Sequence, residues 1–129
     1  MMLCEHVRLG PNNLFDALGV LDRVIAKRLP AAHPNLAVVA LFIAEGDDDL
    51  GDFDTTVSAT MPSGQLIFEG KGRLTLKAAP GTTWLSSARM VFQMQGLPLT
   101  EYGRYWFKVT IGTTEASHPL DVVQPPKTP

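Results

Sequence analysis

The sequence predicts an all-β protein, a single antiparallel sandwich of about seven or eight strands. Three observations indicate this class. Apolar side chains alternate along several segments, turn residues recur about every 8–12 residues, and 11 Gly and 10 Pro are present among 129 residues. A chain of this length forms one domain. We expect that domain to span residues 1–123, with a proline-rich tail at 124–129.

The first half of the chain contains three predicted strands. Residues 3–9 alternate in polarity and end at a Gly-Pro-Asn-Asn turn. Residues 36–45 form a nearly continuous apolar run, which is typical of a central strand covered on both faces. The acidic stretch 46–52 follows as a predicted loop, and residues 55–61 then alternate again, with Val57, Ala59 and Met61 on one face.

A Pro-Ser-Gly turn at 62–64 leads into a long predicted strand at 65–77. Its even positions are apolar at both ends, and Gly70 and Gly72 lie between them on the same face. Glycine inside a strand often marks a bulge or a bend. We therefore expect an irregularity in the middle of this strand.

Three predicted strands complete the domain. Residues 85–95 alternate through Met90, Phe92 and Met94, and the Gly-Leu-Pro sequence at 96–98 is expected to break that run. Residues 105–111 place four large apolar side chains on one face and Trp106 on the other. A last run at 119–123 precedes the tail.

Residues 13–29 allow two interpretations. Leucine and isoleucine recur there at helical spacing, with Asn13 as an N-cap candidate and Pro30 as a terminator. This pattern predicts a helix at 13–29 and an α+β fold as the alternative. A bent strand with Gly19 at the bend is the rival. Periodicity alone favours the helix, although Gly19 costs about 1 kcal/mol within one.

Several segments together resemble an uncharacterised family of small bacterial and phage-encoded proteins. The matching segments are LCEHV, NLFDALGVLDRV, HPNLAVVALF, TMPSGQLIFEG, GLPLTEYGRYWFKVTIG and HPLDV. The resemblance implies an immunoglobulin-like sandwich in which residues 13–29 form a strand with a glycine-linked bend. No catalytic residue comes with the resemblance.

Residues 101–107 (EYGRYWF) resemble the segment that opens a late strand of immunoglobulin-like sandwiches. That likeness implies that the Tyr105 ring joins the core while its hydroxyl bonds to upstream backbone. Phe107 stands where antibody domains carry their second cysteine, so no immunological role is implied.

Composition excludes several function classes. Eleven Lys and Arg against thirteen Asp and Glu give a net charge of −2, so no basic field exists to bind nucleic acid. The single cysteine, Cys4, excludes a disulfide framework and a multi-cysteine zinc site. The longest apolar run is too short to span a membrane, and the first residues lack a secretory signal pattern. These absences predict a cytoplasmic protein, or one incorporated into a phage particle.

The candidates for chemistry are few, and we predict no catalytic, cofactor-binding or metal-ligating residue. Cys4 and His6 share a strand face but lie too far apart for a nucleophile and its base. His33 and His118 each precede a proline and have no ligand spacing. One acidic cluster could bind calcium at the end of a sandwich, although a solvated connection is the expected interpretation. Its members are Asp47, Asp48, Asp49, Asp52 and Asp54.

Two further groups of residues point outward. Lys71, Arg73 and Lys77 share one strand face, which predicts an outer strand or a modest anion-binding patch. Trp84, Tyr102 and Trp106 are the candidates for an interface, because Trp and Tyr are favoured contact residues.

The expected function is a non-enzymatic structural or protein-binding module that binds a protein partner or a second copy. A capsid or particle accessory protein of a phage is one specific version. The alternative is a small cytoplasmic domain that binds calcium or another ligand.

Overall fold

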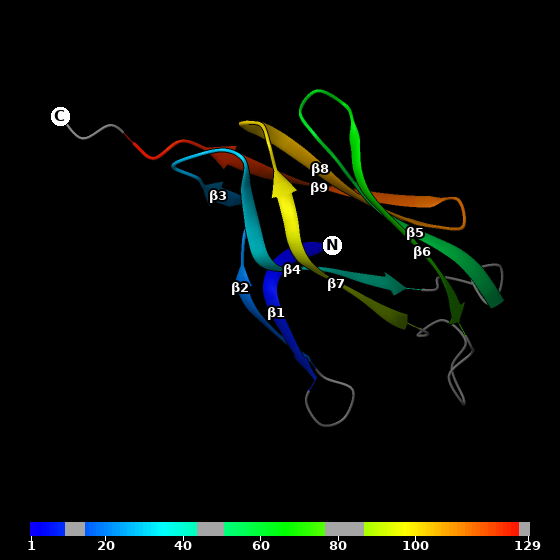
Figure 1. Ribbon diagram of the computed structural model, residues 1–129. Helices are drawn as coiled ribbons and strands as arrows, with labels where there is room; N and C mark the ends of the chain where they lie inside the picture. Colours follow the sequence, from blue (N-terminus) through cyan, green and yellow to red (C-terminus); the bar gives the residue numbers. More distant parts are fainter. Residues whose placement is uncertain (10–14, 44–50, 77–86, 127–129) are drawn as a thin grey trace.

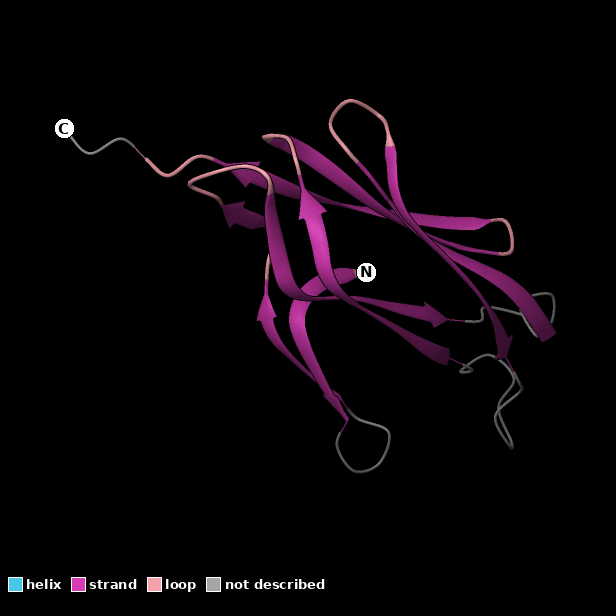
Figure 2. Ribbon diagram, viewed as in Figure 1, coloured by secondary structure: helices cyan, strands magenta, loops and turns pink. Residues whose placement is uncertain are grey.

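The computed structural model describes residues 1–9, 15–43, 51–76 and 87–126, with the backbone alone at 6, 9, 15–18, 32–34 and 87–89. These residues form nine strands and no helix (Figure 2). The strands are β1 (Met2–Leu9), β2 (Phe15–Val20), β3 (Arg23–Ile25), β4 (Ala31–Ile43), β5 (Gly51–Thr60), β6 (Leu66–Leu76), β7 (Ser87–Leu99), β8 (Gly103–Ile111) and β9 (Thr114–Val123).

The strands form two sheets that face each other as a sandwich (Figure 1). The four-stranded sheet has the order β2-β1-β4-β7, and the five-stranded sheet has the order β3-β9-β8-β5-β6. The predicted all-β sandwich is confirmed. Nine strands occur where about seven or eight were expected, and one pair, β3 with β9, is parallel.

The helix considered for residues 13–29 is wrong. The described part of this segment forms β2 and β3, which belong to different sheets. Backbone pairing explains why helical spacing did not decide the structure, since β2 pairs with β1 and β3 pairs with β9. Gly19 has a φ of 68°, a left-handed conformation that favours glycine. A Cβ atom at Gly19 would lie 3.1 Å from Cγ of Glu5 on the neighbouring strand.

The core lies between the sheets, and the predicted alternation places it correctly. Val57 and Ala59 of β5 are buried, and so are Tyr105, Phe107 and Val109 of β8. The opposite sheet contributes buried side chains from β1, β4 and β7. Every residue from 36 to 40 is buried, so β4 is covered on both faces over this stretch, as the apolar run predicted.

Two expected breaks are absent or displaced. The register of β5 with β6 shifts next to the pair of Ala59 with Phe68, and it continues regularly past Gly70 and Gly72. β7 does not end at Gly96, because its register with β4 continues to Leu99. Leu97 and Leu99 are buried in the core, which favours continuation of the strand. Among the described residues, no helix could cross a membrane.

Candidate functional site

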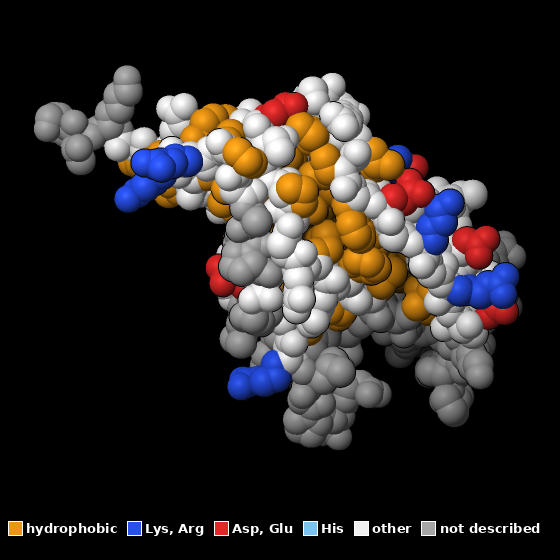
Figure 3. Space-filling model, viewed as in Figure 1, with side chains coloured by type: hydrophobic (Ala, Val, Ile, Leu, Met, Phe, Trp, Pro, Cys, Tyr) orange, Lys and Arg blue, Asp and Glu red, His pale blue; other side chains and the backbone are white. Residues whose placement is uncertain are grey.

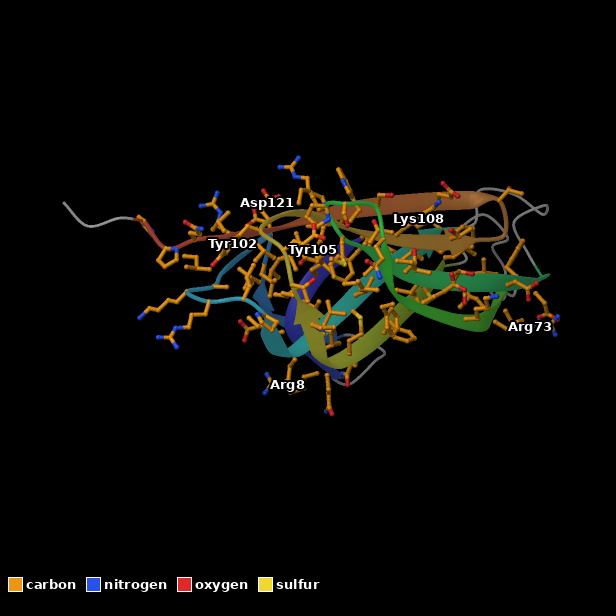
Figure 4. All side chains as sticks on the ribbon, turned by 45° about the horizontal axis from the view of Figure 1, so that its top comes forward. Arg8, Arg73, Tyr102, Tyr105, Lys108 and Asp121 are labelled. Carbon is orange, nitrogen blue, oxygen red and sulfur yellow. The ribbon has the colours of Figure 1, made fainter. Side chains whose placement is uncertain are left out.

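Tyr105 occupies the corner between β7 and β8 that the sequence predicted. Its ring is fully buried between the sheets (Figure 4), and its hydroxyl donates to the Glu101 carbonyl oxygen at 2.9 Å. The same hydroxyl accepts from the amides of Thr100 at 3.1 Å and Glu101 at 3.0 Å. These bonds fix the direction in which β8 leaves the corner, so Tyr105 is a structural anchor and not a ligand contact.

The three interface candidates have different surroundings. Trp84 lies outside the described residues. Tyr102 is half-buried, and its hydroxyl donates to the carbonyl oxygen of Ala26 at 2.9 Å, so it ties the start of β8 to the end of β3. Trp106 is 44% exposed on the outer face of the five-stranded sheet. Trp106 is therefore the more exposed of the two described candidates.

Trp106 lies on a polar face. The Arg104 guanidinium lies 5.9 Å from the centre of the Trp106 ring, and its Nε donates to Asp121 at 2.8 Å. On the same face, Lys108 pairs with Glu115 at 3.1 Å. Apolar side chains that stand singly on a polar surface are ordinary in soluble proteins. Trp106 alone does not define an interface.

The ion pair of Arg104 with Asp121 on this face contributes to the pH dependence of stability. The hydrogen bond from Arg104 lowers the pKa of Asp121, and the same bond raises the pKa of Arg104. Because the pKa of Asp121 is lowered, the pair stabilises the fold above the ordinary carboxyl pKa, and this stability is lost as the pH falls through the lowered pKa. The pair is exposed to solvent, so the contribution is small.

Asp121→Asn is therefore expected to flatten the fall in unfolding free energy between neutral and acidic pH. Urea unfolding followed across that range measures this slope. Arg104→Gln should flatten it to a similar extent, because it removes the donor that lowers the pKa of Asp121. An Asp121→Asn protein with the wild-type pH dependence would contradict the assignment.

The calcium candidates do not form a described site. Asp47, Asp48 and Asp49 lie outside the described residues. Asp52 and Asp54 belong to β5 and not to a loop, and Asp52 accepts a hydrogen bond from the Thr75 hydroxyl at 2.6 Å. Asp54 pairs loosely with Arg73 at 3.7 Å. Within the described ranges, no three His, Cys, Asp or Glu side chains gather as metal ligands would.

The remaining candidates from the sequence are Cys4, the three histidines and the basic residues of the predicted strand at 65–77. Cys4 is fully buried, and burial raises the pKa of its thiol, whereas a nucleophilic cysteine needs access and a lowered pKa. For His6 and His33 the structure describes the backbone alone. The His118 ring nitrogen Nδ1 lies 2.8 Å from the Pro119 carbonyl oxygen. Lys71 and Arg73 are well exposed on β6, an edge strand, as the outer-strand prediction required, and Lys77 lies outside the described residues.

Sequence reasoning missed the outer face of the four-stranded sheet. Residues that are directly paired across antiparallel strands share a face. The register therefore places Val20, Cys4, Ala37 and Gln93 in one row and Met2, Val39 and Val91 in the next. Leu41 and Ile43 continue the same face along β4.

Most described side chains of this face are apolar, and several are exposed. Leu41 is 53%, Ile43 56% and Val20 64% exposed, and Met2 and Val91 each reach 36%. Cys4, Ala37 and Val39 are buried between them. We call these eight residues the outer apolar face. Of the described side chains in its rows, only Gln93 is polar.

A signal for this face was present in the sequence. Strands of antiparallel sandwiches normally alternate, because one sheet face meets the core and the other meets water. The unbroken apolar run at 36–43 departs from that rule. It predicted coverage on both faces, and the structure provides that coverage only as far as Ala40.

The fold and this surface define a class, a two-sheet β-sandwich domain with several exposed apolar side chains on the outer face of one sheet. Over residues 1–123 the chain matches the model of a family of unknown function, DUF6941, and it belongs to that family. Comparisons with curated proteins and with solved structures give no match. The expected membership of an uncharacterised family is confirmed.

Proposed function

We propose that this protein is a non-enzymatic binding module that holds a protein partner against its outer apolar face. The observation that supports this proposal is the group of exposed apolar side chains on adjacent strands of that face, with Met2 on β1, Leu41 and Ile43 on β4 and Val91 on β7. Burying apolar surface yields about 25 cal/mol per Å². Contiguous exposed apolar patches accordingly mark interaction sites, whereas scattered apolar residues do not.

The partner proposed is a second copy of the chain. The eight residues of the outer apolar face are uncharged, although the register also places Arg89 opposite Leu41. Two sheets pack face to face at about 10 Å separation through interdigitating apolar side chains. A two-fold arrangement lets the same patch serve both subunits. Such self-association in the cytoplasm suits an accessory protein of an assembled particle, such as a phage capsid.

The two-sheet fold also has features of a particular class of β-sandwich. We infer an immunoglobulin-like relationship, which two features support. One is the Tyr105 corner at the start of β8, whose hydroxyl bonds back to Glu101. The other is the packing of two largely antiparallel sheets around one core.

Leu41→Asp is expected to abolish self-association, because it places a charge among the exposed apolar side chains of the outer apolar face. Sedimentation velocity over a wide concentration range should show a mass that rises above the monomer for the wild type and stays monomeric for the variant. Ser117→Asp, on the exposed outer side of β9, is the matched control and should associate like the wild type.

Circular dichroism should show the same β-rich spectrum for all three proteins. A wild type that stays monomeric at every concentration contradicts self-association through this face. Equal loss of association in Leu41→Asp and Ser117→Asp would also contradict it, because the effect would then follow charge and not position.

A further inference from the structure

A cavity of about 180 Å³ opens between β6 and β7, the edge strands on one side of the sandwich. Its walls are mainly apolar and come from both sheets, with Val57 and Leu74 on one side and Met90 and Phe92 on the other. Figure 3 shows hydrophobic side chains gathered in a band between the positions of β7 and β6. The cavity is separate from the outer apolar face, because it faces the interior.

Two missing side chains create this space. Gly70 and Gly72 lie on the inward face of β6, where Phe68 and Leu74 carry large side chains. A Cβ atom at Gly70 would lie 2.7 Å from Cζ of Phe92, so only glycine lets this ring lie over β6. The Phe92 ring in turn meets Phe68 at a centroid distance of 5.2 Å. The two glycines therefore make room for the Phe92 ring and the cavity, and they do not form a β-bulge.

The Thr55 hydroxyl lies in the opening that Gly72 leaves. A Cβ atom at Gly72 would lie 3.2 Å from Oγ1 of Thr55, and Thr55 is only 5% exposed. Within the part of the chain that the structure describes, this hydroxyl has no hydrogen-bond partner, and Thr55 is the one polar residue buried there. Buried hydroxyls are normally hydrogen-bonded to protein or water, so Thr55 offers a polar group to whatever occupies the cavity.

We propose that this cavity binds a small neutral molecule with an apolar body about the size of a benzene ring and one hydroxyl or carbonyl group. The size follows from the volume, since an apolar cavity of about 150 Å³ accepts benzene. The polar group would bond to the Thr55 hydroxyl. Lys71 and Arg73 line the cavity, and each has a carboxylate outside it within reach, Glu69 at 3.6 Å and Asp54 at 3.7 Å. Because both cations of the described lining have a partner and the remaining walls are mainly apolar, the ligand proposed is neutral.

Phenol and benzene are the probes, because they share a ring and differ by one hydroxyl. Titration of the labelled wild-type protein, followed by NMR, should give saturable shifts at Val57 and Phe92. We expect phenol to bind about tenfold more tightly than benzene, the ratio that one hydrogen bond supplies. Thr55→Val keeps the side-chain shape, and should bind both probes with equal affinity.

Two further variants separate this site from a general loss of structure. Thr110→Val removes a hydroxyl from the outer side of β8 and should retain the wild-type preference for phenol. Gly72→Ala fills part of the cavity and should weaken both probes while the protein still unfolds cooperatively.

Three outcomes would overturn the proposal. The first is the absence of saturable phenol shifts in the folded wild type, which would make the cavity a pocket for water. The second is a preference for phenol that survives in Thr55→Val. The third is binding of both probes that Gly72→Ala leaves unchanged, which would place them elsewhere.

Discussion

Replacing Phe107 with Ala is expected to lower the free energy of unfolding by about 3–5 kcal/mol. Phe107 is fully buried at the centre of the five-stranded sheet, where β8 pairs with both β5 and β9. The substitution removes an aromatic ring from the core and leaves a cavity that the neighbouring strands cannot close. Small domains are stable by only about 5–15 kcal/mol, so this loss is a large fraction of the total. Urea unfolding followed by fluorescence measures it.

Trp106→Ala is the matched control for this prediction. Trp106 is the next residue along β8, and its side chain points to the opposite face. We expect a loss of about 1 kcal/mol at most, as is usual for surface positions. Because Trp106 lies far from the outer apolar face, this variant should also self-associate like the wild type. Equal losses for Phe107→Ala and Trp106→Ala would contradict the assignment of the core face.

Replacing Tyr105 with Phe is expected to lower the free energy of unfolding by about 1–3 kcal/mol, although only one oxygen atom is removed. The hydroxyl donates to the Glu101 carbonyl and accepts from the amides of Thr100 and Glu101. Its loss leaves these backbone groups without their partner at a part-buried corner. The ring itself keeps its packing, so the measured loss reports the hydrogen bonds.

Tyr102→Phe provides the comparison, because Tyr102 makes a single hydrogen bond through its hydroxyl, to the carbonyl oxygen of Ala26. A typical single bond contributes about 0.5–1.5 kcal/mol, so Tyr102→Phe should lose less than Tyr105→Phe. Chemical unfolding of both variants under the same conditions gives the two values. A Tyr105→Phe protein as stable as the wild type would show that the corner does not depend on these bonds.

The alternation of β8 and the role of Tyr105 could be predicted because both depend on local sequence. Side chains two residues apart share a strand face, so Tyr105, Phe107 and Val109 had to face the core together. The corner was implied by the short segment that precedes β8, and its hydrogen bonds span only four or five residues. Neither inference required knowledge of the opposite sheet.

The parts that could not be predicted depend on contacts between distant residues. The spacing of leucines at 13–29 favoured a helix, but the partners of β2 and β3 are strands that no local pattern reveals. Gly70 suggested a bulge because the sequence does not show that Phe92 of the other sheet lies above it. The apolar run of β4 indicated burial, but it did not indicate that Leu41 and Ile43 would be left exposed.

The parallel pairing of β3 with β9 has a consequence for the order in which the chain can fold during synthesis. Arg23 pairs with Asp121, and Ile25 pairs with Val123, so strands from near the two ends of the domain are neighbours. Contacts between residues so distant in sequence form slowly, because a long loop must close first. On the ribosome, β3 therefore waits without its partner until β9 has emerged. The five-stranded sheet is completed only after the last strand of the domain has been released.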